Sequence, residues 1–151
     1  MKALTIRQPW AHLVIHGPKG IEKRTWATRH RGPLAIHASA SRALLNCPQT
    51  RRRLARLGYD MPREADMAFG ALIGVVNLVD VVTPDAQADD PLAVGPHCWV
   101  FTQRRALERP LPCQGNRMLW EVSCQFVKPL RTCCADDVDP AVGFLPFRRG
   151  L

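Results

Sequence analysis

The stretch HGPKGIEKRTW, residues 16–26, places Lys19, Glu22 and Arg24 close together, just before a bulky tryptophan. Its GPKG segment is typical of a turn, and the alternation that follows predicts a strand running to Trp26. Every second side chain of a strand points to the same face. We therefore expect Glu22, Arg24 and Trp26 to share one face, with Lys19 reaching over it from the turn.

Such a face has the chemistry of a binding site. Glu22 and Arg24 are spaced to form a charge-assisted ion pair, and Lys19 is able to donate to a phosphate or to a developing oxyanion. Trp26 offers a ring on which a base can stack. If the protein is an enzyme, Lys19 and Glu22 are the candidate catalytic residues, with Glu22 as general base. From the spacing alone, an ordinary surface ion pair beside a turn is an equally good interpretation.

The segments on either side predict alternating strands and helices. ALTI at 3–6 indicates a first strand, and PWAHLVIHG at 9–17 a helix that Gly17 ends. RGPLAIHAS at 31–39 predicts a turn followed by another strand.

Residues 39–59 predict a helix broken near Pro48. Thr50 is the expected cap of its second part and Gly58 its end. The exposed face of this second part carries four arginines, which are Arg51, Arg52, Arg53 and Arg56.

The second half of the chain is rich in strand patterns. GALIGVVNLVDVV at 70–82 predicts a long strand with a possible bulge at Gly74. HCWVFTQRRAL at 97–107 predicts a strand that turns near the following ERPLP, and NRMLWEVSCQF at 116–126 a last long strand. The pattern weakens over a C-terminal tail at about 129–151.

Strands outnumber helices in this order, and the late strands follow one another as hairpins do. We therefore predict an α+β fold, a small and mostly antiparallel β-barrel with flanking helices, formed by residues 1–151 as a single domain.

The charge is concentrated in one half of the chain. Net charge is +8 overall, but residues 1–63 carry +11 and residues 64–151 carry −3. A basic half predicts a polyanionic partner, here RNA or a nucleotide-like ligand. A basic surface that only aids solubility, or that docks an acidic protein, is the alternative. The residues expected to bind nucleic acid are Lys19, Glu22, Arg24, Trp26, Arg7, Arg51, Arg52 and Arg53.

Other function classes are not indicated. The six cysteines contain no C-x-x-C pair, so we expect reduced thiols, no metal site and no cofactor. No apolar run is long enough to span a bilayer, and the N-terminal sequence does not resemble a signal peptide. We expect a cytoplasmic protein that does not contact membranes, and the sequence leaves its oligomeric state open.

The motif G-x-K-x-x-E-x-R at residues 17–24 resembles the signature of the ASCH domain family, which is related to the PUA RNA-binding domains. Further blocks of the chain are similar to the family in the same order. They are LTIRQPWAHLVIHG, RGPLAIHAS, GALIGVVNLVDVV, GPHCWVF and PLPCQGNRMLWEV. The resemblance covers residues 2 to about 127.

This resemblance implies a PUA-like barrel with a cleft at the motif, and RNA binding in RNA metabolism or transcription regulation. It also implies a hydrolase as an alternative, because one branch of the family removes the acetyl group from acetylated cytidine and another is associated with ribonuclease activity. Lys19 matches the catalytic lysine of the deacetylating branch. The position of that branch's threonine holds Glu22 here, and Thr25 lies on the opposite strand face, so its catalytic set is not carried over intact.

Overall fold

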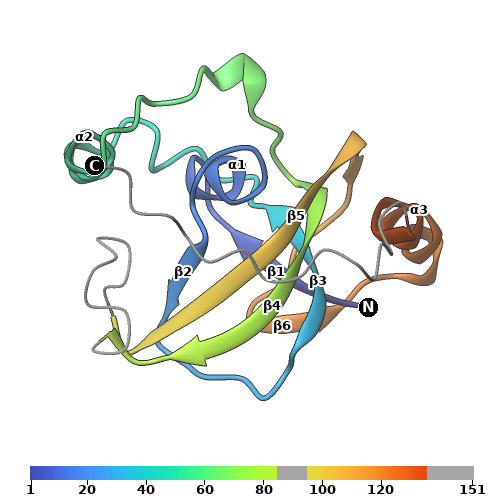
Figure 1. Cartoon of the computed structure of the whole chain (residues 1–151). Helices are drawn as coiled ribbons and strands as arrows, with labels where there is room; N and C mark the ends of the chain where they lie inside the picture. Colours follow the sequence, from blue (N-terminus) through green and yellow to red (C-terminus); the bar gives the residue numbers. More distant parts are fainter. Residues whose placement is uncertain (85–94, 136–151) are drawn as a thin grey trace, which may run out of the picture.

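The computed structural model of the protein describes residues 1–84 and 95–135, and in these residues the chain has an α+β fold (Figure 1). Six strands form one mixed, mostly antiparallel sheet in the order β2-β5-β4-β3-β1-β6. The sheet curls into a half-barrel and is accompanied by three short helices. The fold class predicted from the sequence is confirmed, with a half-barrel in place of a closed barrel.

The N-terminal elements follow the prediction. β1 (Lys2–Ile6) leads into α1 (Trp10–Ile15), and β2 (Ile21–Arg24) follows the turn. β3 (Gly32–Ala38) then pairs in parallel with β1, the one parallel pairing among the described strands. β2 is shorter than predicted, because it ends at Arg24 and leaves Trp26 beyond the strand.

The second helix differs from its prediction. α2 (Pro48–Arg56) starts at Pro48 instead of breaking there, and the residues before it form turns. Proline suits the first turn of a helix because its missing N–H has no acceptor there in any case. Thr50 consequently lies inside the helix, where it is buried, and does not cap it. Gly58 follows the last turn with a φ of +70°, as predicted for a helix end.

β4 (Ala71–Val82) and β5 (His97–Pro112) are the long antiparallel pair at the centre of the sheet. In the pairing of β4 with β3, one extra β4 residue lies between Leu72 and Gly74, opposite the step from Ile36 to His37, which confirms the predicted bulge. A Cβ at Gly74 would run into the backbone carbonyl of Arg105, so the bulge requires glycine. The turn predicted near ERPLP is wrong, because β5 continues through that segment to Pro112.

The C-terminal part also departs from the prediction. The last strand, β6 (Leu119–Glu121), is short, and α3 (Cys124–Ala135) follows it where a strand and a weakly patterned tail were expected. Pro129, after which the sequence pattern weakens, lies inside this helix. The rest of the predicted tail, 136–151, lies outside the described residues.

Two hydrophobic cores lie on the two faces of the sheet. Leu34 and Ile36 of β3 belong to the core that α1 covers, whereas Ala35 between them belongs to the core beside α3. This alternation is the two-residue period of a strand covered on both sides. Figure 1 shows α1 and α3 on opposite sides of the curled sheet, with α2 beyond α1. The most voluminous side chain of the first core is Trp99, which is fully buried.

Candidate functional site

Lys19 is buried beneath the turn that joins α1 to β2. Lys19 is only 4% exposed, and its ammonium donates to Oε2 of Glu22 at 2.5 Å and to the backbone carbonyl of Ile21. The backbone N–H of Lys19 donates to the carbonyl of Leu13, which ties the turn to α1. Lys19 reaches the Glu22 carboxylate from the turn, as predicted, but its ammonium is buried and points inward.

Glu22 and Arg24 lie on one strand face, as their spacing predicts. Oε1 of Glu22 is 3.4 Å from Nη2 of Arg24, so the two oxygens of this carboxylate serve two different cations. Nη2 of Arg24 also donates to the carbonyl of Thr5 in β1 at 2.9 Å. Nε of Arg24 is buried and has no acceptor among the described residues. Arg24 therefore has a hydrogen-bond donor to spare.

The sheet register fixes the position of the carboxylate. Glu22 pairs directly with Trp99 in the antiparallel β2–β5 ladder. Side chains that are directly opposite in such a ladder point to the same face. Glu22 is therefore carried at the margin of the core that α1 covers, where little water screens its charge.

Electrostatics around Lys19 are dominated by burial. Desolvation lowers the pKa of the Lys19 ammonium below its ordinary value, and the Glu22 carboxylate opposes this shift. Arg53 and Arg24 lower the same pKa further because they add positive charge nearby. Lys19 and Arg24 both pair with the Glu22 carboxylate, and Arg53 acts on Lys19, so the cluster formed by Lys19, Glu22, Arg24 and Arg53 carries a formal excess of positive charge. We call these four residues the charge cluster.

Arg53 brings α2 into the charge cluster. Its guanidinium carbon lies 5.4 Å from the ring centroid of Trp10, the first residue of α1, in a cation–π contact. The side chain is half-buried, whereas Arg51, Arg52 and Arg56 are exposed. The prediction that these arginines share one exposed face is therefore wrong for Arg53. Its link to Lys19 was not visible in the sequence.

The remaining predicted site residues lie in two different settings. Trp26 is half-buried, and its ring meets Trp99 edge-on with centroids 4.7 Å apart. Its backbone carbonyl accepts a hydrogen bond from Nε1 of Trp99, so Trp26 also closes one side of the first core. Arg7 is exposed just before α1.

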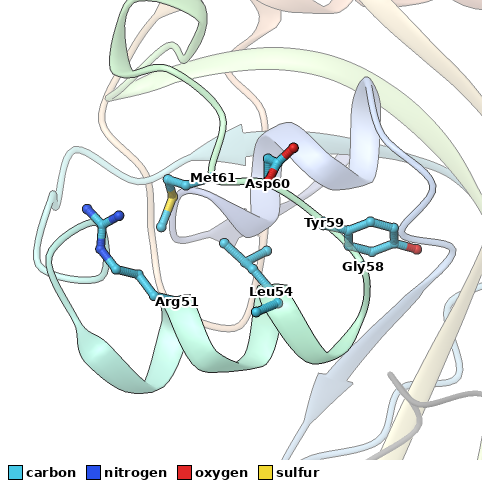
Figure 2. Close-up of a pocket in the computed structure, with 7 residues that line it drawn as sticks. Arg51, Leu54, Gly58, Tyr59, Asp60 and Met61 are labelled. Atoms are coloured by element: carbon cyan, nitrogen blue, oxygen red, sulfur yellow. The ribbon is translucent and has the colours of Figure 1, made fainter.

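A separate pocket of about 470 Å³ lies along α2. It is lined by residues of the helix and of the segment that follows it, which are Arg51, Leu54, Ala55, Gly58, Tyr59, Asp60 and Met61. Figure 2 shows Arg51 and Met61 toward one end of this pocket and the Tyr59 ring at the other. We call it the α2 pocket. The sequence prediction included only Arg51 of these residues.

Metal-ligating groups do not gather in the described part of the chain. No three side chains of histidine, cysteine, aspartate or glutamate come together in residues 1–84 and 95–131. Cys47, Cys113 and Cys124 are free thiols. None of the helices in the same residues has the length and apolar character needed to cross a membrane.

The half-barrel with its buried lysine–glutamate pair defines the class of protein as one with an ASCH/PUA-like fold. A model of the ASCH domain family matches residues 4–106, and the chain belongs to this family. The resemblance seen in the sequence is thereby confirmed, and the charge cluster includes the three charged residues of the family signature.

Curated relatives and solved structures agree with this assignment. The chain is 30% identical over 134 residues to human activating signal cointegrator 1, and 32% identical over 131 residues to the mouse protein. Each alignment covers 82% of this chain, which spans only 22% of the length of either relative. The crystal structure of an ASCH protein from Zymomonas mobilis matches with a TM-score of 0.52 at 11% identity, over 87% of this chain and 93% of that one. At this identity the match supports the fold alone.

Proposed function

We propose that the protein binds RNA, or a nucleotide-like part of it, at the charge cluster. The observation that carries this proposal is the charge imbalance of the cluster. The positive charges of Arg24 and Arg53 both act on Lys19, while Glu22 supplies the only negative charge. Like charges held together away from water repel one another, and a phosphate would neutralise the excess. The Nε donor of Arg24 has no hydrogen-bond acceptor among the described residues, and an anion could supply one.

Each cation has a distinct place in this binding. Lys19 is buried and serves as the fixed charge beneath the site, whereas Arg24 and Arg53 are the half-buried groups that are able to meet a phosphate. Trp10 supports the guanidinium of Arg53 from below and keeps it in place. The name of the curated relatives refers to a signal cointegrator, and we include a role in transcription regulation or RNA metabolism in the proposal.

A pair of substitutions with opposite expected signs tests this function. Arg53→Gln should weaken the binding of a short fluorescent RNA about tenfold, since a hydrogen bond to a charged group contributes roughly 1.5–3 kcal/mol. Glu22→Gln should leave binding unchanged or tighten it, because it removes the only negative charge of the cluster. The measurement is fluorescence anisotropy at low salt. Absence of binding by the wild type, or preference for an acidic peptide, would refute the proposal.

A hydrolase is the second candidate, and one observation favours it. Burial lowers the pKa of Lys19 and thereby raises the fraction of neutral, nucleophilic amine, while a carboxylate lies 2.5 Å away. Such a pair suits attack on RNA or on a modified nucleoside. In that case Glu22→Gln should retain binding but lose turnover by about 100-fold or more in single-turnover assays. A wild type without turnover on RNA and on acetylated cytidine would remove this candidate.

A further inference from the structure

Beyond the charge cluster, the α2 pocket is a second place where the molecule has the means to hold a nucleotide. We propose that it accepts one further nucleotide of the same bound RNA strand, so that the strand crosses α2. The inference rests on the proposed RNA binding and extends it to residues that the family signature does not include.

The helix geometry places the two sites on opposite sides of α2. Successive residues of an α-helix are rotated by about 100°, so Arg51 and Arg53 point about 200° apart. Arg53 faces Trp10 and the charge cluster, whereas Arg51 lines the α2 pocket. One short helix thus presents a guanidinium to each side, and a strand lying across it would meet both.

The backbone that ends α2 fixes the far wall of the pocket. The N–H of Tyr59 donates to the carbonyl of Leu54 at 2.9 Å, and that of Gly58 to the carbonyl of Ala55 at 3.0 Å. Together with the positive φ of Gly58, these are the two hydrogen bonds of a Schellman motif. The motif holds Tyr59 in a defined position beside Leu54, so this wall is set before a ligand arrives.

The lining matches the parts of a nucleotide. Its volume of about 470 Å³ lies within the roughly 300–1,000 Å³ usual for small-molecule sites. Tyr59 and Met61 offer aromatic and apolar surface for a base, and Arg51 offers a cation for its phosphate. In the described part of the chain, Arg51 and Asp60 form no ion pair, although both line the pocket. Asp60 therefore has a free carboxylate that is able to accept from a ribose hydroxyl or a base amine.

Matched arginine substitutions in the full chain test the proposal. Arg51→Ala, Arg56→Ala and Arg109→Ala each remove one exposed positive charge, but of the three only Arg51 lines the pocket. Affinity for a labelled oligonucleotide of about ten residues should fall at least fivefold more for Arg51→Ala than for the other two. Equal losses in all three variants would show a general charge effect and overturn the inference.

Substitutions of Tyr59 test the base contact. Tyr59→Leu should weaken binding by about tenfold, since stacking contributes roughly 1–3 kcal/mol per base, whereas Tyr59→Phe should stay within twofold of the wild type. Thermal unfolding of both variants checks that the Schellman motif still forms. If Tyr59→Leu and Arg51→Ala both bind RNA as tightly as the wild type, the proposed binding at the α2 pocket is wrong, but RNA binding at the charge cluster is not. Failure of the wild type to bind RNA overturns the proposed function itself.

Discussion

Glu22→Gln is the change that probes the charge cluster most directly. The side chains of Lys19 and Glu22 are 5% and 12% exposed, so their ion pair is largely removed from water. Removing one partner of a buried pair typically costs about 3–5 kcal/mol, because the other charge stays buried without compensation. Glutamine retains a carbonyl oxygen that still accepts from the ammonium, and we therefore expect the lower end, about 3 kcal/mol. For a domain of this size, that corresponds to a fall in Tm of roughly 6–12 °C.

The chain contains a matched control for this loss. Glu64 pairs with Arg42 at 2.7 Å, but the two side chains are 57% and 60% exposed. Exposed pairs contribute little, so Glu64→Gln should cost less than about 1 kcal/mol. Thermal and urea unfolding, followed by circular dichroism, give both values under identical conditions.

The same variant has an expected effect on ligand binding. Glu22→Gln raises the formal charge of the cluster from +2 to +3, so added RNA should restore part of the lost Tm. Two results would refute the reasoning. If Glu22→Gln is as stable as Glu64→Gln, the buried pair does not support the fold. If it binds RNA more weakly than the wild type, the carboxylate acts as a ligand for RNA and not as a counterion.

Three further predictions concern salt, pH and the end of α2. Replacing the arginines at 51–53 together by alanine should reduce the slope of log affinity against log salt by up to about 3, since each phosphate contact contributes about 0.9; an unchanged slope in a salt titration would contradict this. Because the pKa of Lys19 is lowered in the folded protein, the unfolded chain holds that proton more tightly. Stability should then rise with pH between the lowered pKa and the ordinary lysine pKa. This rise in the free energy of unfolding should be absent in Lys19→Met. If urea unfolding gives the same pH profile for the wild type and this variant, the prediction is wrong. Gly58→Ala should cost about 1 kcal/mol through the positive φ, and a neutral effect in the same unfolding assay would show that α2 ends differently.

Much of the fold could be predicted because its local signals agree with its tertiary structure. Gly17, Gly58 and Gly74 mark two helix ends and a bulge at the positions predicted from the sequence. The alternation in β1, β3 and β4 is strong because these strands are covered on both faces by separate cores. The order of strands and helices already predicted a small, mostly antiparallel barrel with flanking helices, and the family signature implied the same architecture.

Three errors in the predicted helices and strands have the same physical origin, which is the presence of proline. Pro48 was interpreted as a helix break, although it is favourable in the first turn of α2. Pro110 and Pro112 suggested a turn, yet β5 passes through both. Pro129 suggested that regular structure ends, yet it lies inside α3. A proline excludes one N–H from hydrogen bonding, and only the tertiary pairing decides whether that N–H was needed.

The sequence identified three of the four residues of the charge cluster as one site, but it did not predict how deeply Lys19 is buried. The spacing of Glu22 and Arg24 predicted their pairing, whereas the burial of Lys19 ran against the strong tendency of lysine to stay exposed. Arg53 could not be separated from its neighbours by sequence, since its role depends on the packing of α2 against Trp10. The position of Tyr59 in the wall of the α2 pocket was predictable from the sequence, because glycine followed by an apolar or aromatic residue at a helix end is typical of a Schellman motif.

The burial of the charge cluster bears on both of the proposed functions. A lysine held at the margin of a core, with its carboxylate counterion at 2.5 Å, is costly to keep charged and is easily shifted by a single neighbour. In the proposed RNA binding, the positive charges of Arg24 and Arg53 would attract a phosphate, which would lower the repulsion within the cluster. The same two cations lower the pKa of Lys19, so the loss of either should raise that pKa and reduce the neutral amine that the proposed hydrolase would need. Arg53, which lies outside the signature, therefore affects both proposed functions.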